Sequence, residues 1–166
     1  RVLRDQLLID SPAAMEDINS PAWVRTAEAC ALTAGVMGGL GGARCRTVAA
    51  HAVHNGLTQL PACHDALHGE KVGFGILVQL RLEERMGGNR LAAQAHRQLL
   101  PLLRQLGLPV CLDDLGLAQA SLSDLQQVCS FACRDGSDLH HLPFSVTPGA
   151  LLEALVGAAE PSPLHS

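Results

Sequence analysis

Histidines are the residues of this chain whose type and spacing could do chemistry. Four of the eight histidines lie in one short window, at positions 51, 54, 64 and 68. Neutral imidazole is a common ligand of divalent transition metals. His51 and His54 are three residues apart, so they can share one face of a helix. Spacing alone leaves two readings open, a metal site and a set of core histidines, because no H-E-x-x-H or E-x-x-H motif is present.

The segments that must position these histidines are predicted to be helices. Serine or threonine followed by proline, as at Ser20-Pro21 and Thr147-Pro148, is typical of a helix start. Asn89 is a further cap, and Pro101 is expected to kink or end the helix that Asn89 begins. The predicted helices cover residues 22–36 (ending at Gly38-Gly39), 47–60, 68–86, 90–106, about 121–135 and 148–155, with a short turn at 112–115.

The sequence therefore predicts an all-α fold, a bundle of about six or seven helices. We expect one helical domain over residues 1–160, with the clustered histidines as its candidate metal-binding site, and a frayed tail at residues 161–166. Because the chain begins on Arg1 inside a helical pattern, we expect this domain to be truncated at its N-terminal side. Hydrophobic residues make up 48% of the chain and aromatic residues only 2%. This composition supports a sizeable core and disfavours a sheet-rich fold.

Charge and composition also bear on partners and compartment. The formal net charge of −4 and the scarcity of aromatic side chains argue against nucleic acid as a partner. No apolar run approaches the length that crosses a bilayer, so we expect no membrane partner. Six cysteines without a C-x-x-C pair or a signal peptide are interpreted as reduced, mostly buried thiols. We predict a cytoplasmic protein.

Several segments carry a resemblance to a known family. The segment Ala50–Thr58 reads A-H-A-V-H-N-G-L-T, and His68–Gly75 reads H-G-E-K-V-G-F-G. Together they closely resemble the metal-binding core of glycerol dehydrogenases, in the iron-containing alcohol dehydrogenase superfamily. The resemblance continues at Leu106–Pro109, at Leu115-Gly116 and at Leu139–Pro148, and it covers most of the chain from about residue 30 onward.

The resemblance implies a specific ligand set. In that family one aspartate and two histidines hold a divalent metal, zinc or iron. The first family histidine corresponds to His51 and the second to His68. The family aspartate lies in a G-D-A segment that this sequence lacks, and the nucleotide-binding domain is also missing. His54, His64, Asp65 or water are candidates for the position left open.

The implied function is that of the C-terminal helical domain of a metal-dependent, NAD(P)-linked alcohol or polyol dehydrogenase. There the metal polarises a substrate hydroxyl for hydride transfer, and the substrate is a small polyol or a 2-hydroxy compound. His54 is the candidate catalytic residue, relaying a proton. NAD(H) would be bound only through the missing N-terminal domain, so we expect this chain alone to be inactive.

Two alternatives stay open. One is a catalytically inactive helical remnant that binds metal loosely. The other is a dehydroquinate synthase-like lyase, whose family has a similar pair of histidines. Lys71 in the second segment, and H-A-V-H-N-G in place of G-H-T-x-G-H in the first, favour the dehydrogenase branch.

Other residues near the histidines have two readings each. Asn55 and Thr58 could orient an imidazole, or Asn55 could end a helix together with Gly56. Glu70 is expected to compensate the helix dipole. Lys71 is interpreted as a surface or partner-pairing residue.

The remaining histidines are expected to lie outside the site. His140 and His141 are interpreted as packing or capping residues, or as contacts near the active-site cleft. His96 and His165 are expected to be solvated. We also expect exposed apolar surface where the missing domain would dock, and self-association through that helical surface.

Overall fold

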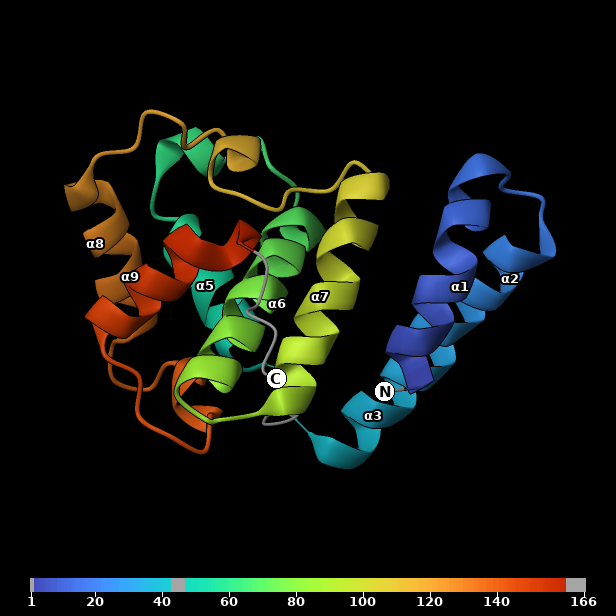
Figure 1. Ribbon diagram of the computed structural model, residues 1–166, viewed down its shortest axis with the longest axis horizontal. Helices are drawn as coiled ribbons and strands as arrows, with labels where there is room; N and C mark the ends of the chain where they lie inside the picture. Colours follow the sequence, from blue (N-terminus) through green and yellow to red (C-terminus); the bar gives the residue numbers. More distant parts are fainter. Residues whose placement is uncertain (1, 43–46, 161–166) are drawn as a thin grey trace. The chain divides into compact units, whose positions relative to one another are not determined.

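The computed structural model describes residues 2–42 and 47–160, and all regular structure within these ranges is helical (Figure 1). The α-helices are α1 (Val2–Glu16), α2 (Pro21–Glu28), α3 (Ala34–Gly41), α5 (Ala49–Leu57), α6 (His68–Arg85), α7 (Arg90–Gln105), α8 (Leu122–Ala132) and α9 (Pro148–Val156). Short turns of other helix types are η1 (Ala29–Thr33), η2 (Pro61–Cys63), η3 (Asp113–Leu115), η4 (Asp138–His141) and η5 (Gly157–Ala159). The predicted all-α fold is confirmed, while the predicted tail at 161–166 lies outside the described residues.

Two adjoining helices and the turn between them form one continuous helix. α2 passes into α3 through the π-turn η1 without leaving the helical region of backbone space. Counted in this way, the described residues hold seven α-helices, within the predicted number. The predicted stop at Gly38-Gly39 is wrong, because glycine weakens a helix without ending it. The helix ends only at Gly42, whose φ of +64° a helix cannot contain.

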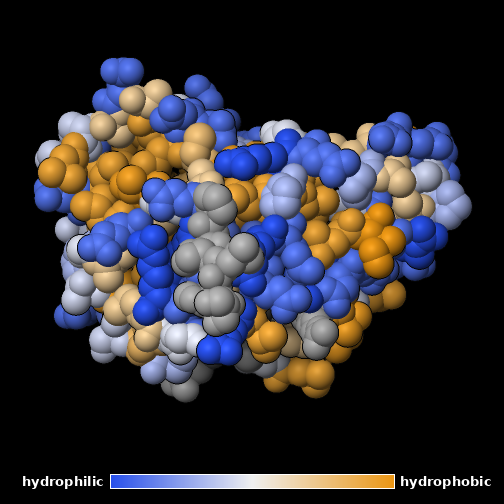
Figure 2. Space-filling model, viewed as in Figure 1, coloured by the Kyte–Doolittle hydropathy of each residue, from blue (hydrophilic) through white to orange (hydrophobic). Residues whose placement is uncertain are grey.

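The chain divides into two compact units. The first comprises Arg1–Arg46 with Gln105–Gly107, and the second comprises Thr47–Arg104 with Leu108–Ser166. In the first unit, α1 packs against α2, and Arg25 pairs with the buried carboxylate of Asp10 at 2.6 Å. Many large apolar side chains of this unit are exposed, and orange surface is visible over α1 (Figure 2).

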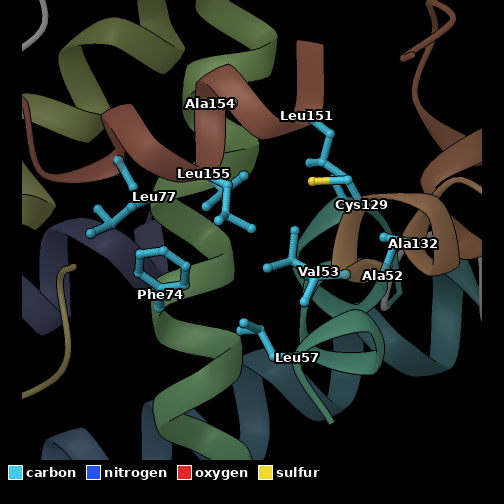
Figure 3. Close-up of a cluster of buried hydrophobic side chains, with 14 of the residues drawn as sticks. Ala52, Val53, Leu57, Phe74, Leu77, Cys129, Ala132, Leu151, Ala154 and Leu155 are labelled. Carbon is cyan, nitrogen blue, oxygen red and sulfur yellow. The ribbon is translucent and has the colours of Figure 1, made fainter. Parts of the chain in front are cut away.

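The second unit is built around one hydrophobic core. Phe74, Leu77 and Val78 lie on one face of α6 at helical spacing and are fully buried. They meet side chains from α5, α8 and α9, which point toward one another in Figure 3. Burial of such side chains is the main driving force of folding. The core therefore holds α5 and the start of α6 in place, and these are the helices that carry the clustered histidines.

Two glycines allow α5 to approach its neighbours closely. A Cβ added to Gly75 of α6 would lie 2.5 Å from the carbonyl oxygen of Ala50 on α5. One added to Gly56 of α5 would lie 2.6 Å from the carbonyl oxygen of Val128 on α8. Gly56 lies inside the helix, so its interpretation as a terminating residue is wrong. These two contacts fix the position of α5 relative to α6 and α8.

Most helix starts agree with the sequence prediction. The side chains of Ser20, Asn89, Ser121 and Thr147 accept hydrogen bonds from backbone N–H groups of the first turn. Pro101, however, does not end α7, which continues to Gln105. Buried side chains flank the proline on either side in this helix, and their packing outweighs the single backbone hydrogen bond that proline removes.

α5 is shorter than predicted at both ends. Thr47 lies before the helix, and its hydroxyl donates to the carboxylate of Asp138 at 3.0 Å. Leu60 is extended, as expected for a residue that precedes proline. Within residues 2–42 and 47–160, no helix combines the length and apolar character that a bilayer crossing requires.

Candidate metal centre

Three histidines of the second unit are brought together by α5 and α6. His51 and His54 lie on α5, and His68 is the first residue of α6. The carboxylate of Glu70 accepts a hydrogen bond from the backbone N–H of Leu67 at 2.6 Å, which fixes the start of α6. Glu70 is thus a capping residue of the first turn, in keeping with its expected role at the helix dipole. Three of the four histidines of the sequence window, His51, His54 and His68, thus form one cluster of imidazoles.

The rings of His51 and His68 lie close to one another. Their centroids are 5.9 Å apart, with the ring planes at 53°. Two imidazoles that share a tetrahedral zinc have centroids about 5 Å apart, from zinc–nitrogen bonds of about 2.1 Å. His51 is half-buried and His68 is exposed, so a dissolved cation can reach the second ring. The two rings are thus within about 1 Å of the separation that a shared zinc requires.

A complete set of metal ligands does not form within the described residues. In residues 2–42 and 47–160, no group of three or more histidine, cysteine, aspartate or glutamate side chains is placed to hold a metal ion. His64 and Asp65, two of the candidates for a third ligand, are exposed and belong to no such group. Within these residues His51 and His68 thus have no third side chain placed with them as a metal ligand.

His54 contacts both His68 and Asn55. Its Nε2 atom lies 3.0 Å from Nδ1 of His68, and its Nδ1 atom lies 3.0 Å from Oδ1 of Asn55. The rings of His54 and His68 meet edge to face, with centroids 4.3 Å apart. Asn55 is thus in contact with an imidazole, which is one of its two predicted roles. Its backbone carbonyl accepts from the hydroxyl of Thr58 at 2.8 Å.

Burial and charge favour a neutral His54. Burial is the largest influence and lowers the pKa of His54 below its ordinary value, while the hydrogen bond with Asn55 opposes that shift. Positive charge on His68, Lys71 or His51 lowers the pKa of His54 further. A neutral imidazole keeps one nitrogen free to accept a hydrogen bond or bind a metal.

Lys71 is buried, so its interpretation as a surface residue is wrong. It is only 5% exposed, and its ammonium group donates to the carbonyl oxygen of Cys63 at 2.8 Å. Position 71 lies one turn after His68, on the inward face of α6. A carbonyl oxygen next to the ammonium group offsets part of the cost of burying the charge. Lys71 thus ties η2 to α6 behind the histidine cluster.

Comparison with known proteins identifies the homologues of the chain. No protein-family model matches it. The chain is 58% identical over 156 residues to an uncharacterized oxidoreductase of Synechocystis sp., covering 94% of the chain and 40% of the relative. It is 36% identical over 163 residues to the glycerol dehydrogenase of Pseudomonas putida, covering 95% and 42%. A crystal structure of a probable glycerol dehydrogenase from Sinorhizobium meliloti 1021 superposes with a TM-score of 0.81 at 33% identity, over 96% of the chain and 44% of that structure. The chain is homologous to the glycerol dehydrogenases.

This glycerol dehydrogenase homologue spans about two fifths of the length of the relatives it matches. The resemblance stated from its motifs is confirmed, as is its place among homologues of oxidoreductases. A Halobacterium salinarum relative, 39% identical over 125 residues, is a glycolaldehyde reductase.

Other histidines of the glycerol dehydrogenase homologue serve packing and capping. His140 Nε2 lies 3.1 Å from the carbonyl oxygen of Arg134, and His141 Nδ1 lies 2.8 Å from that of Thr47. Arg134 follows α8 and Thr47 precedes α5, so both histidines bond to carbonyl groups just outside a helix. His165 lies outside the described residues.

A buried polar cluster was missed by sequence reasoning. His96 is fully buried rather than solvated, and its Nε2 donates to the carbonyl oxygen of Ala158 at 2.8 Å. Arg81, also fully buried, donates to the carboxylate of Glu84 and to the carbonyl oxygen of Gly157. The cluster anchors η5. The sequence did contain one indication of this cluster. Position 81 continues the apolar face of α6, and a charged side chain buried there needs hydrogen-bonding partners.

A groove of about 760 Å³ was likewise not predicted. Gln79 and Glu83 of α6 lie on one wall, and the segment from His141 to Phe144 lies on another. The Gln79 amide donates to Glu83 at 2.9 Å, and the Asn89 amide donates to the same carboxylate at 3.1 Å. Glu83 thus accepts from both Gln79 and Asn89 and links the end of α6 to the start of α7.

Proposed function

We propose that this chain is the helical, metal-binding part of a metal-dependent, NAD(P)-linked polyol dehydrogenase similar to glycerol dehydrogenase. The observation that carries the proposal is the approach of His51 and His68, whose ring centroids lie 5.9 Å apart in a homologue of glycerol dehydrogenases. We propose zinc or iron as the metal, and a small polyol or 2-hydroxy compound as the substrate. We propose the cytoplasm as the place of action.

Each residue of the cluster has a proposed task. His51 and His68 bind the cation, and a bound divalent cation supplies a Lewis acid that lowers the pKa of a substrate hydroxyl. His54 is proposed as a proton relay, because its Nε2 lies 3.0 Å from Nδ1 of His68 and a proton can pass along such a contact. Hydride transfer requires a nicotinamide, which we propose is bound by a part of the enzyme outside this chain.

Zinc titration of the purified chain tests the metal pair. Isothermal titration calorimetry is expected to show zinc uptake by the wild type. His51→Ala and His68→Ala are each expected to weaken uptake by at least about 10-fold, since each removes one of two imidazoles. His64→Ala is the control, because His64 is an exposed histidine between the two helices. No uptake by the wild type, or equal uptake by all variants, would overturn the metal pair.

NAD titration tests the proposal that the nicotinamide is bound outside this chain. We expect no NAD binding and no polyol oxidation by the 166-residue chain on its own. Saturable NAD binding would contradict the proposal that the nicotinamide is held elsewhere.

A second candidate function is a non-catalytic helical module that binds metal loosely. The observation that favours it is the lack of a third ligand among the described residues. The two candidates differ when the chain is joined to the remaining part of a glycerol dehydrogenase relative: the first expects metal-dependent polyol oxidation, and the second expects none. No observation favours the lyase alternative.

A further inference from the structure

Asn55, His54 and His68 form a short line of hydrogen-bonding atoms. Oδ1 of Asn55 lies 3.0 Å from Nδ1 of His54, and Nε2 of His54 lies 3.0 Å from Nδ1 of His68. An amide oxygen can only accept a hydrogen bond. Nδ1 of His54 must therefore carry a hydrogen and donate it to Asn55.

The first contact determines the direction of the second. A neutral imidazole carries one hydrogen, so the Nε2 atom of a His54 protonated at Nδ1 is an acceptor. Nδ1 of His68 must then carry a hydrogen and donate it to His54. A neutral His68 in this tautomer has its lone pair on Nε2, the nitrogen on the other side of the ring.

We propose that His54, oriented by Asn55, is a positioning residue that holds His68 in the Nδ1–H tautomer and leaves its Nε2 free to bind the metal. This inference rests on the proposed metal pair. Histidine ligands of metals generally donate their second ring N–H to a neighbouring acceptor, which fixes the ring and raises its basicity. Here the acceptor is a second imidazole.

The support for His54 is rigid on the α5 side. The carbonyl oxygen of Asn55 accepts from Thr58 at 2.8 Å and from the side-chain amide of Gln59 at 3.2 Å. Gly56 fixes this turn against α8 through its close approach to Val128. His68, by contrast, is an exposed residue at the first position of its helix. The hydrogen bond that His68 donates to His54 therefore restrains a ring that is otherwise exposed at the helix start.

The tautomer can be measured directly on the metal-free chain. Long-range ¹H–¹⁵N correlation spectra at about pH 8, above the ordinary imidazole pKa, distinguish the two tautomers, and the His68→Ala spectrum assigns the signal. We expect the Nδ1–H form for His68 in the wild type. His54→Phe keeps a ring of similar shape without nitrogens, and in this variant we expect His68 to lose its preference for the Nδ1–H form.

Zinc titration supplies the second readout. His54→Phe is expected to weaken zinc binding by about 10- to 100-fold. Asn55→Asp keeps an acceptor in place, so it should retain both the tautomer and the affinity, whereas Asn55→Leu should lose part of each. His64→Phe is the matched control and should behave as the wild type. Circular dichroism melts show that each compared variant is folded.

The outcomes separate this inference from the proposed function. An Nε2–H tautomer of His68 in the wild type overturns the inference, as does a His54→Phe variant that keeps both the tautomer and the zinc affinity. Loss of the tautomer preference in Asn55→Asp would show that Asn55 donates and would overturn it as well. A wild type that shows the Nδ1–H tautomer but takes up no zinc would instead overturn the proposed metal pair.

Discussion

The two units of the chain differ in how they use their apolar side chains. The second unit buries many large apolar residues in one core, with Phe74 and Leu77 fully enclosed. In the described part of the first unit the buried residues are small or polar: Asp10, Ser11, Ala14, Ala22 and Ala29. Large apolar side chains of that unit are exposed instead, with Leu40 at 85% and Ile9 at 76%.

Because of this difference, we expect the second unit to determine the stability of the protein and the first unit to determine its association. A unit with its own core gains most of its folding free energy from that core, and the histidine cluster is attached to it. A unit with exposed apolar residues and small buried ones gains little from burial and retains surface that water disfavours. Substitutions in the second unit should therefore change stability and the histidine geometry, whereas those in the first should change association.

The largest expected effect is the loss of a core side chain. Phe74→Ala should lower the free energy of unfolding by about 3–5 kcal/mol, because it removes a fully buried aromatic ring and leaves a cavity. Urea unfolding followed by circular dichroism measures the change. Ile9→Ala in the first unit is the control and should leave the stability nearly unchanged. A comparable loss in Ile9→Ala would abolish the contrast between the units.

A smaller effect is expected where α6 meets α5. Gly75→Val should cost about 1–3 kcal/mol, since its Cβ would lie 2.5 Å from the carbonyl oxygen of Ala50. It should also displace His51 from His68 and weaken zinc uptake. Gly73→Ala on the same helix is the control, because nothing lies within 4 Å of its added Cβ. That variant should gain up to about 1 kcal/mol in helix propensity. A Gly75→Val protein as stable as Gly73→Ala would contradict the close approach.

The buried polar cluster predicts sensitivity to acid in the second unit. Burial is the main cause that lowers the pKa of His96, and the charge of Arg81 lowers it further, against the opposing hydrogen bond to Ala158. A histidine in the unfolded chain has a pKa of about 6.5. Above that pH His96 is neutral in both states and the protein has its full stability. As the pH falls toward the lower pKa of the folded state, the unfolded state gains a proton first, so the free energy of unfolding decreases.

His96→Gln tests this pH dependence. Free energies of unfolding measured between about pH 7 and pH 5 should fall less steeply in the variant, because glutamine does not titrate. His54 also has a lowered pKa, so His54→Phe should remove a further part of the slope. Identical slopes in the wild type and His96→Gln would remove His96 as a cause.

The smallest effect on stability, and the one that tests the first unit, concerns association. We propose that the chain self-associates through the exposed helical surface of α1–α3. Val36→Glu combined with Leu40→Glu places charges on two exposed apolar positions of α3. In sedimentation velocity runs over a range of protein concentrations, this variant should have a lower average mass than the wild type, with little change in the free energy of unfolding. Leu91→Glu, at an exposed apolar position of the second unit, should leave association unchanged. A wild type that is monomeric at all concentrations would overturn the proposal.

Local features of the sequence predicted most of the fold. Helix starts at Ser20, Asn89, Ser121 and Thr147 are set by side chains that bond to backbone groups only two or three residues away. Such short-range chemistry can be read without knowing the fold. The predicted helix end at Gly38-Gly39 was wrong because glycine is only mildly unfavourable in a helix. At Pro101 the alternative of an early helix end was wrong, because packing on both sides of the proline outweighs its larger cost.

What the sequence by itself determined about this protein is its helical class, its helix starts and the crowding of histidines in one window. Only the tertiary structure decided that His54 contacts His68 and that Lys71 and His96 are buried. It also decided that Gly56 is a contact point rather than a helix end, and that Gly75 is a second contact point. The physical reason is distance along the chain. Capping and periodicity depend on neighbours within a turn or two, whereas burial and contact depend on segments such as α5, α8 and η5 that meet only after the core has formed.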